Sequence, residues 1–209
     1  KVKPGEKVRL ACIGIGFRGG EIIKKFEATE LCDIVALCDI NMGAEHTLET
    51  IERHPDVPRY QDFRKMFAEM GDKIDAVSVG TPDHSHFPIC MLAMSLGINV
   101  YVEKPMAHTF YECELMMEAE KKYGVVTQMG NQGASGEGVN LACEWLWNGE
   151  IGEVTRVDAF TDRPIWPQGL ERPTEEHEIP STLNWDAFIG PAPKRPYNSI
   201  YHPWNFRGW

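Results

Sequence analysis

The sequence of 209 residues lacks a long hydrophobic run and a concentration of positive charge. Its longest apolar stretch, residues 91–102, is interrupted by Ser95, Gly97 and Asn99 and is too short to cross a bilayer, so we expect no membrane segment. The 21 basic side chains are outnumbered by 31 acidic ones, which gives a net charge of −10. We therefore expect no nucleic-acid partner, because phosphate backbones require a positive footprint. A small-molecule ligand is compatible with this charge.

Cysteine is also scarce, and none of the six cysteines forms a C-x-x-C pair. The common zinc-binding patterns need such pairs, and the cysteine density is too low for a small disulfide scaffold. Cys12 and Cys38 lie inside apolar runs that are typical of buried strands. We predict that the cysteines are small core residues and that the protein has no metal site.

Short apolar runs alternate with segments of helical periodicity over the first 150 residues. The predicted strands cover residues 8–13, 33–38, 74–79, 99–102 and 125–128. The predicted helices cover residues 21–28, 44–53, 63–70, 89–96, 111–123 and 139–147. This alternation, with strands that are apolar almost throughout, predicts an α/β fold with a doubly wound parallel sheet covered by helices on both faces.

The character of the sequence changes at residue 151. Residues 154–160 alternate between apolar and polar types, which predicts a strand with one wet face. Eight of the 14 prolines and four of the six tryptophans follow Arg163. We expect a first domain over residues 1–150 and the beginning of a second over residues 151–209. Further sequence would complete its sheet, because one strand alone is not stable.

Gly14, Gly16 and Gly19 form a G-x-G-x-x-G pattern between the first predicted strand and the first predicted helix. In such a turn the first glycine allows the tight bend, the second admits a pyrophosphate, and the third lets helix and strand pack closely. The helix N-terminus would present free N–H groups and a positive dipole end to phosphates. Taken alone, the triplet fits a glycine-rich turn equally well.

Asp39 lies 20 residues after Gly19, at the end of the second predicted strand. At this spacing a carboxylate accepts hydrogen bonds from the adenosine ribose hydroxyls. The alternative is an aspartate that only caps the next helix. The order of strand, glycines, helix, strand and acid favours dinucleotide binding. No Arg or Lys stands beside Asp39 to bind a 2′-phosphate, so we predict NAD in preference to NADP.

Polar residues follow three further predicted strands, at Thr81-Pro82-Asp83-His84-Ser85-His86, Glu103-Lys104-Pro105 and Gly130-Asn131-Gln132. Strand ends of a doubly wound sheet form the ligand crevice, so these loops are candidates for the site. Asp83 or Ser85 could instead cap a helix. Lys104 could contact a substrate hydroxyl or carry a proton, whereas Glu103 and Lys104 could equally form a surface ion pair.

These motifs, in this order and spacing, resemble the glucose-fructose oxidoreductase / inositol dehydrogenase / MocA family over about residues 8–163. The resemblance implies an N-terminal Rossmann domain that binds NAD or NADP, a C-terminal domain with an open sheet, and hydride exchange at a secondary alcohol of a sugar or cyclitol. By the same resemblance Lys104 would contact the substrate. The residues expected to bind the cofactor are Gly14, Gly16, Phe17, Arg18, Gly19, Asp39, Thr81, Pro82, Asp83, His86, Glu103 and Asn131.

The sequence departs from the family pattern in one respect. Family dehydrogenases usually carry an Asp and a His four residues apart on a helix of the second domain, and no D-x-x-x-H occurs here. Residues 201–209 resemble the segment upstream of that motif in a bacterial subgroup, many of whose members carry export signals. We expect the catalytic acid or base to lie beyond Trp209, and both a periplasmic and a cytoplasmic location stay open. Tyr201 and His202 could shape a sugar site or be core or dimer-contact residues.

Three functions are compatible with these residues. The leading hypothesis is an NAD-dependent oxidoreductase of sugars, cyclitols or glycosides that is a homo-oligomer through its C-terminal domain. The second is an NAD-dependent glycoside hydrolase, in which transient oxidation of the sugar acidifies a neighbouring proton and allows elimination. The third is a nucleotide-binding protein without catalysis.

Overall fold

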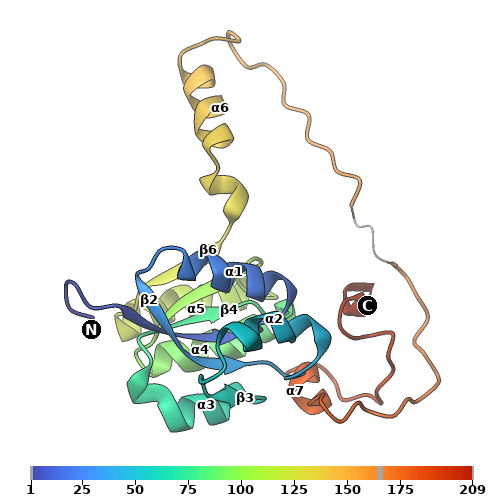
Figure 1. Cartoon of the computed structure of the whole chain (residues 1–209). Helices are drawn as coiled ribbons and strands as arrows, with labels where there is room; N and C mark the ends of the chain where they lie inside the picture. The colour runs from blue at the N-terminus through green and yellow to red at the C-terminus, as the bar shows by residue number, and fades with distance from the viewer. Residues whose placement is uncertain (1, 164–166, 209) are drawn as a thin grey trace. The chain divides into compact units, whose positions relative to one another are not determined.

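The computed structural model describes residues 2–163 and 167–208 (Figure 1). Contacts between residues divide the chain into two compact units. The first consists of Lys1–Gly130 and Pro180–Lys194, and the second of Asn131–Ile179 and Arg195–Trp209. Residues 180–194 thus return to the first unit although the second unit begins at Asn131. The domain boundary at residue 150 that the sequence suggests stays a prediction.

The first unit is built on one six-stranded sheet in which all paired strands are parallel. The strands lie in the order β3-β2-β1-β4-β5-β6. Successive strands from β1 to β3 are added on one side of β1, and those from β4 to β6 on its other side, so the strand order switches between β1 and β4. This is the order of the dinucleotide-binding Rossmann fold, and the predicted fold class is confirmed. The strands are β1 (Val8–Ile13), β2 (Cys32–Cys38), β3 (Arg59–Tyr60), β4 (Ala76–Val79), β5 (Asn99–Glu103) and β6 (Thr127–Gly130).

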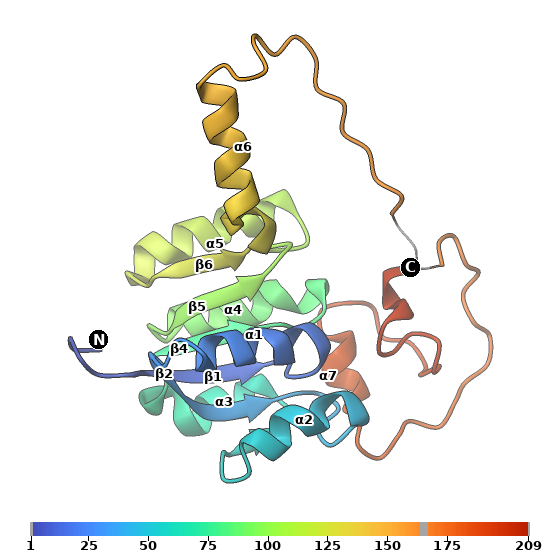
Figure 2. The same cartoon turned by 45° about the horizontal axis from the view of Figure 1, so that its top comes forward.

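Helices α1 and α2 cover one face of the sheet, and α3, α4 and α5 cover the other (Figure 2). The helices of the first unit are α1 (Phe17–Glu27), α2 (Glu45–Arg53), α3 (Phe63–Met70), α4 (His86–Ser95), α5 (Phe110–Tyr123) and α7 (Trp185–Ile189). The second unit contains α6 (Glu137–Trp147). Short 3-10 turns cover Gly71–Lys73, Asp83–Ser85, Gln132–Ser135 and Asn205–Gly208.

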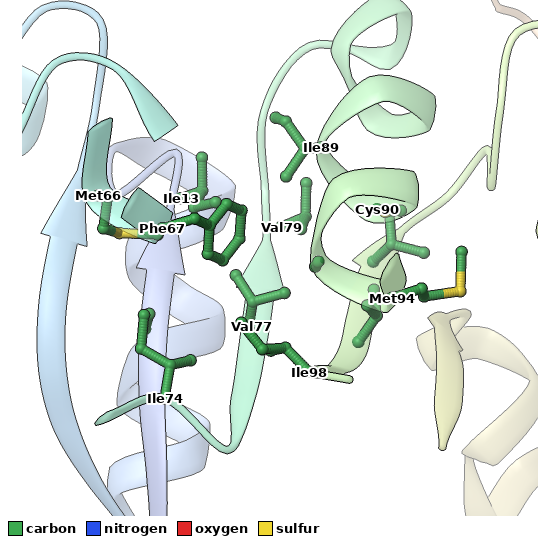
Figure 3. Packing of buried hydrophobic residues seen from close by; sticks show 14 of the residues in the cluster. Ile13, Met66, Phe67, Ile74, Val77, Val79, Ile89, Cys90, Met94 and Ile98 are labelled. Atoms are coloured by element: carbon green, nitrogen blue, oxygen red, sulfur yellow. The ribbon is translucent and has the colours of Figure 1, made fainter. Parts of the chain in front are cut away.

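The apolar strands have two buried faces, which explains why their sequences do not alternate between apolar and polar residues. In β1, Cys12 packs with Ile23 of α1 on one face, and Ile13 belongs to the larger cluster on the opposite face. Figure 3 shows this larger cluster, in which Phe67 of α3 and Ile89 of α4 lie beside the strands. The sheet is therefore the middle layer of three, and its loops are left free to form a site.

Two helices that pack against the larger core cluster, α3 and α5, have capping residues at their ends. Asp62 caps α3 by accepting a hydrogen bond from the Arg64 N–H at 2.9 Å. Thr109 and Glu112 form a capping box at the start of α5, and α5 ends at Gly124, which has a φ of +63°. These local signals fix helix boundaries without help from the rest of the fold.

Three of the six cysteines are core residues as the sequence predicts, whereas Cys32, Cys113 and Cys143 are only partly buried. All six are free, and Cys12, Cys38 and Cys90 are buried. Burial raises the pKa of Cys90 to about 12 and raises the pKa values of Cys12 and Cys38 as well. These thiols stay protonated near neutral pH and contribute packing rather than reactivity.

The predicted strands and helices of the first unit are present, with ends that differ by a few residues from the expected ones. Two elements were not predicted: β3, which has only two residues, and α7, a five-residue helix in the proline-rich region. The prediction of a strand over residues 154–160 is wrong, because this described segment is exposed and forms no ladder. An alternating pattern produces a strand only where a neighbouring strand satisfies its backbone groups.

Two features concern the described residues alone. None of their helices combines the length and the apolar character that crossing a membrane would require. Likewise, no three of their His, Cys, Asp or Glu side chains gather in a way that could hold a metal ion.

Candidate functional site

The first glycine of the turn lies where three strand ends meet. Gly14 has a φ of +76°, and its N–H donates to the carbonyl oxygen of Cys38 at the end of β2 (2.8 Å). A Cβ atom at Gly14 would lie 2.7 Å from the carbonyl carbon of Gly80 and 2.8 Å from the nitrogen of Thr81, which follow β4. Both the backbone conformation and the lack of space therefore require glycine here.

The other two glycines allow helices to approach the turn. A Cβ atom on Gly19 would collide with the carbonyl oxygen of Gly14, so the third glycine lets α1 pack against the end of β1. A Cβ atom on Gly16 would collide with the ring of His46 and would lie 2.9 Å from the His46 carbonyl oxygen in α2. Gly16 thus has a packing role that sequence reasoning missed, and its contact with a pyrophosphate stays a prediction.

The start of α1 has the properties of an anion site. No side chain caps the helix at Gly16, and its first turn contains no acidic residue. The first N–H groups of a helix have no partner within the helix, so they can donate to a phosphate. Phe17 has a φ of +43° and is 56% exposed, and its ring stacks on that of His46 with centroids 4.9 Å apart.

Asp39 is buried at the end of β2 and holds the glycine turn in place. Its Oδ2 accepts a hydrogen bond from the Ile15 N–H, and its Oδ1 accepts one from the Asn41 N–H, both at 3.0 Å. Each carboxylate oxygen can accept a further hydrogen bond, so a ribose diol would find acceptors here. Asp39 does not cap α2, which has no side-chain cap, so the capping alternative is not found.

Thr81 supplies a polar atom that needs a partner. Its Oγ1 is shielded from solvent and forms no hydrogen bond within the described part of the chain. Its backbone nitrogen lies next to Gly14, at the point between β1 and β4 where the strand order reverses. Buried hydroxyls without partners are rare in native proteins, and a ligand at this crevice would supply the partner. The residues present therefore fit a bound dinucleotide.

The loop at 81–86 is fastened to the loop at 103–105 by one side chain. His86 is fully buried, and its Nε2 lies 2.8 Å from the Thr81 carbonyl oxygen while its Nδ1 lies 2.7 Å from the Pro105 carbonyl oxygen. Both ring nitrogens thus face backbone acceptors, which makes His86 a positioning residue for the two loops. Its direct contact with a cofactor stays a prediction.

Two other predicted residues of the 81–86 loop lie before α4. Pro82 precedes the 3-10 turn Asp83–Ser85, and this turn leads into α4. Ser85 stands just before the helix but forms no side-chain cap, so the alternative in which Ser85 caps α4 is not found. The cofactor contacts of Pro82 and Asp83 stay predictions.

Glu103 and Lys104 do not pair with each other. Glu103 is buried, and its Oε1 accepts a hydrogen bond from Arg18 Nε at 3.3 Å. Lys104 is exposed and has no ion-pair partner among the residues that the structure describes. Arg18 also pairs with Glu21 at 2.6 Å, and its Nη2 is buried without a hydrogen-bond partner in the described chain. The surface ion pair of Glu103 and Lys104 is therefore not found among the described residues, and the substrate contact of Lys104 stays a prediction.

Three predicted residues belong to the second unit. Asn131 directly follows β6 and is exposed. Tyr201 is 4% exposed, with the guanidinium group of Arg195 5.5 Å from its ring centroid, and it lines a cavity of about 190 Å³. His202 is half-buried. The burial of Tyr201 agrees with the core-residue alternative, and the substrate roles of Tyr201 and His202 stay predictions.

The comparisons with known proteins agree with this geometry. The family model described as "Oxidoreductase family, NAD-binding Rossmann fold" (GFO_IDH_MocA) matches residues 8–131. A 2,7-anhydro-N-acetylneuraminate hydratase from Mediterraneibacter gnavus is 29% identical over 147 residues, which are 70% of this chain and 37% of that protein. A glycosyl hydrolase family 109 protein from Solibacter usitatus is 33% identical over 144 residues, which are 62% of this chain and 31% of that protein.

A solved structure shows the same similarity. The crystal structure of a dehydrogenase from Chromobacterium violaceum superposes with a TM-score of 0.62 at 28% identity, covering 71% of this chain and 42% of that one. The chain thus spans about a third to two fifths of the length of these relatives.

The histidine that precedes α4 is sensitive to pH. Burial lowers the pKa of His84 because it disfavours the charged imidazolium, and His108 and His86 act in the same direction. The hydrogen bond from His84 Nε2 to the carbonyl oxygen of Phe188 (2.6 Å) and the charge of Asp83 oppose this shift. His84 therefore takes up a proton less readily in the folded than in the unfolded protein.

We predict that the free energy of unfolding falls as the pH drops below about 6.5, the ordinary pKa of histidine, because the unfolded state then binds more protons. The contribution of His84 is fully present above that pH and is lost as the pH falls through the folded-state pKa. Urea unfolding at pH 8 and pH 5.5 should show a smaller loss of stability for His84→Gln than for the wild type. Equal losses in the two proteins would contradict the assignment.

Proposed function

Because the chain belongs to the Gfo/Idh/MocA oxidoreductase family, whose NAD-binding Rossmann domain it contains, we propose that it binds NAD at the turn of Gly14, Gly16 and Gly19 and exchanges hydride with a secondary alcohol of a sugar, cyclitol or glycoside. The observation that carries this proposal is that the start of α1 has no side-chain cap while the nearby Thr81 hydroxyl is buried without a hydrogen-bond partner among the described residues. Both lie at the β1–β4 crevice, where such folds bind dinucleotides.

In the proposed reaction, NAD would carry the hydride, and the protein would bind NAD and the substrate and handle the proton. NAD, when bound, accepts or returns the hydride at its nicotinamide ring. The turn and Thr81 would hold the phosphates and the adjoining nucleotide, and the Asp39 carboxylate would accept hydrogen bonds from the adenosine ribose. Lys104, exposed at the end of β5, would orient the substrate hydroxyl and help to move its proton. Homo-oligomer formation through the second domain belongs to the same proposal.

A second candidate function is redox-assisted cleavage of a glycoside. It is favoured by the 33% identity to a glycosyl hydrolase family 109 protein. In this reaction the oxidised sugar carbon acidifies the neighbouring C–H, the proton leaves, and the aglycone is eliminated. Addition of water and return of the hydride complete the cycle, so NAD is regenerated without net change.

The first prediction concerns the ribose carboxylate. Asp39→Ala should weaken NAD binding roughly 10- to 100-fold, the value of hydrogen bonds to one charged group, and should reduce the preference for NAD over NADP. Isothermal titration calorimetry with both coenzymes measures this effect. Asp33→Ala is the matched control, because Asp33 lies on the same strand but is exposed and pairs with Lys7. An unchanged NAD to NADP ratio in Asp39→Ala would count against the assignment.

The second prediction concerns the lysine. In the native protein, Lys104→Ala should lower turnover about 100-fold or more, within the usual range for general acid–base groups, while the Kd for NAD stays within about twofold. Lys121→Ala, an exposed lysine in α5, serves as the control and should retain full turnover. If Lys104→Ala is as active as the control, Lys104 does not contact the substrate.

The third prediction distinguishes the two reactions. Incubation of the native protein with NAD and a panel of sugars and glycosides should yield NADH in proportion to the oxidised sugar if the protein is a dehydrogenase. Released aglycone without accumulation of NADH identifies the hydrolase. Tight NAD binding without either product identifies a nucleotide-binding protein without catalysis.

A further inference from the structure

A segment far along the chain contacts two loops that flank the candidate site. Residues 180–194, which include α7, belong to the first unit. Trp185, Phe188 and Ile189 are each 6% exposed, so the short helix is anchored by apolar burial. Figure 2 shows α7 near the loop that precedes α2. The inference that follows rests on the proposed binding of NAD.

The segment binds the two residues that directly follow Asp39. The Asn184 N–H donates to the carbonyl oxygen of Ile40 at 2.7 Å. The Thr182 hydroxyl donates to Asn41 Oδ1 at 2.8 Å. Gln61, which follows β3, donates through Nε2 to the carbonyl oxygens of Thr182 (2.6 Å) and Ile40 (3.2 Å). The loop after β2 is therefore held from outside the sheet.

These bonds continue to the carboxylate itself. Asn41 is 8% exposed and Asp39 is 9% exposed, and the Asn41 N–H donates to Asp39 Oδ1. The other carboxylate oxygen accepts from the Ile15 N–H in the glycine turn. Asn41 thus takes part in two bonds through different groups: its side-chain Oδ1 accepts from the Thr182 hydroxyl, and its backbone N–H donates to Asp39. Buried hydrogen-bond networks fix the orientation of their members more strongly than isolated bonds do.

The same segment also contacts the loop after β4. His84, in the loop after β4, donates to the carbonyl oxygen of Phe188, and the two rings meet edge to face with centroids 5.7 Å apart. Residues 180–194 therefore connect the loop after β2 with the loop after β4. These two loops carry Asp39, proposed to hold the adenosine ribose, and Thr81, proposed to help hold the phosphates.

We propose that Thr182 is a positioning residue for the dinucleotide. Its hydroxyl holds the side chain of Asn41 and thereby the backbone at Asn41, whose N–H orients the carboxylate of Asp39 toward the ribose diol. Thr182 itself is exposed, whereas Asn41 and Asp39 are buried. The competing explanation is that the Thr182 bond only tethers the segment to the first unit.

The test compares Thr182→Val, which keeps the shape and removes the hydroxyl, with Thr182→Ser, which keeps the hydroxyl. Calorimetric titration of the native protein and the variants with NAD and NADP is the measurement. We expect Thr182→Val to bind NAD about threefold to tenfold more weakly, the effect of one ordinary hydrogen bond, and to lose NAD preference by a similar factor. Thr182→Ser should match the wild type, as should Ser181→Ala.

A double-mutant cycle separates positioning from tethering. If Thr182 acts through Asp39, then Thr182→Val should have no further effect on the Kd for NAD in an Asp39→Ala background. An equal loss of affinity in both backgrounds, or no loss in either, overturns the proposal. Where NAD binding to Asp39→Ala is too weak to titrate, the NAD to NADP ratio of Thr182→Val against Thr182→Ser decides: an equal ratio overturns it. Absence of NAD binding in the wild type would instead refute the proposed function itself.

Discussion

The close approach of three backbone segments is the constraint on which the candidate site depends. Gly14 at the end of β1, Gly19 in α1 and Gly80 at the end of β4 pack backbone against backbone. A Cβ atom on Gly80 would lie 2.8 Å from the Cα of Gly19, and one on Gly14 would lie 2.7 Å from the carbonyl carbon of Gly80. A side chain at Gly19 or Gly80 would push α1 away from the sheet, and one at Gly14 would push apart the ends of β1 and β4. Only with glycine can the uncapped end of the helix stand directly over the point where the strand order reverses.

The loops around this junction are held by buried polar side chains rather than by a ladder of strands. Asp39 accepts hydrogen bonds from two loop N–H groups, and His86 faces the carbonyl oxygens of two different loops. Loop backbone groups outside the sheet need such partners, because they would otherwise be buried without hydrogen bonds. Residues that the sequence assigns to ligand binding thus also maintain the loop structure. For this reason a change at a residue that acts only through another one, such as Thr182, is more informative than a change at Asp39 alone.

The order of the elements, and with it the meeting of the loops after β1 and β4 at one edge of the sheet, could be predicted from the sequence, whereas the links between distant segments could not. Apolar strands, the glycine spacing and Asp39 are local signals, and each lies within one strand–helix unit. The roles of His46, Asn41 and Thr182 depend on contacts between elements, such as the Thr182–Asn41 bond that spans 141 positions in the sequence. No local pattern announces such a bond. The wrong prediction of a strand at residues 154–160 has the same cause. An alternating sequence indicates which side chains would face the core, but it does not show whether a neighbouring strand is there to pair with.

The two candidate reactions share their first step, and this explains why the first unit alone does not separate them. In both, hydride leaves a carbinol carbon and a proton leaves its oxygen, so NAD and one proton-handling group suffice. Lys104, exposed and without an ion-pair partner in the described chain, has the chemistry for that proton. For a dehydrogenase, this hydride and proton transfer completes the reaction. Glycoside cleavage also needs a base for the proton next to the new carbonyl and an acid for the leaving oxygen. The number of additional acid–base groups that face the sugar therefore determines which reaction the same dinucleotide domain supports.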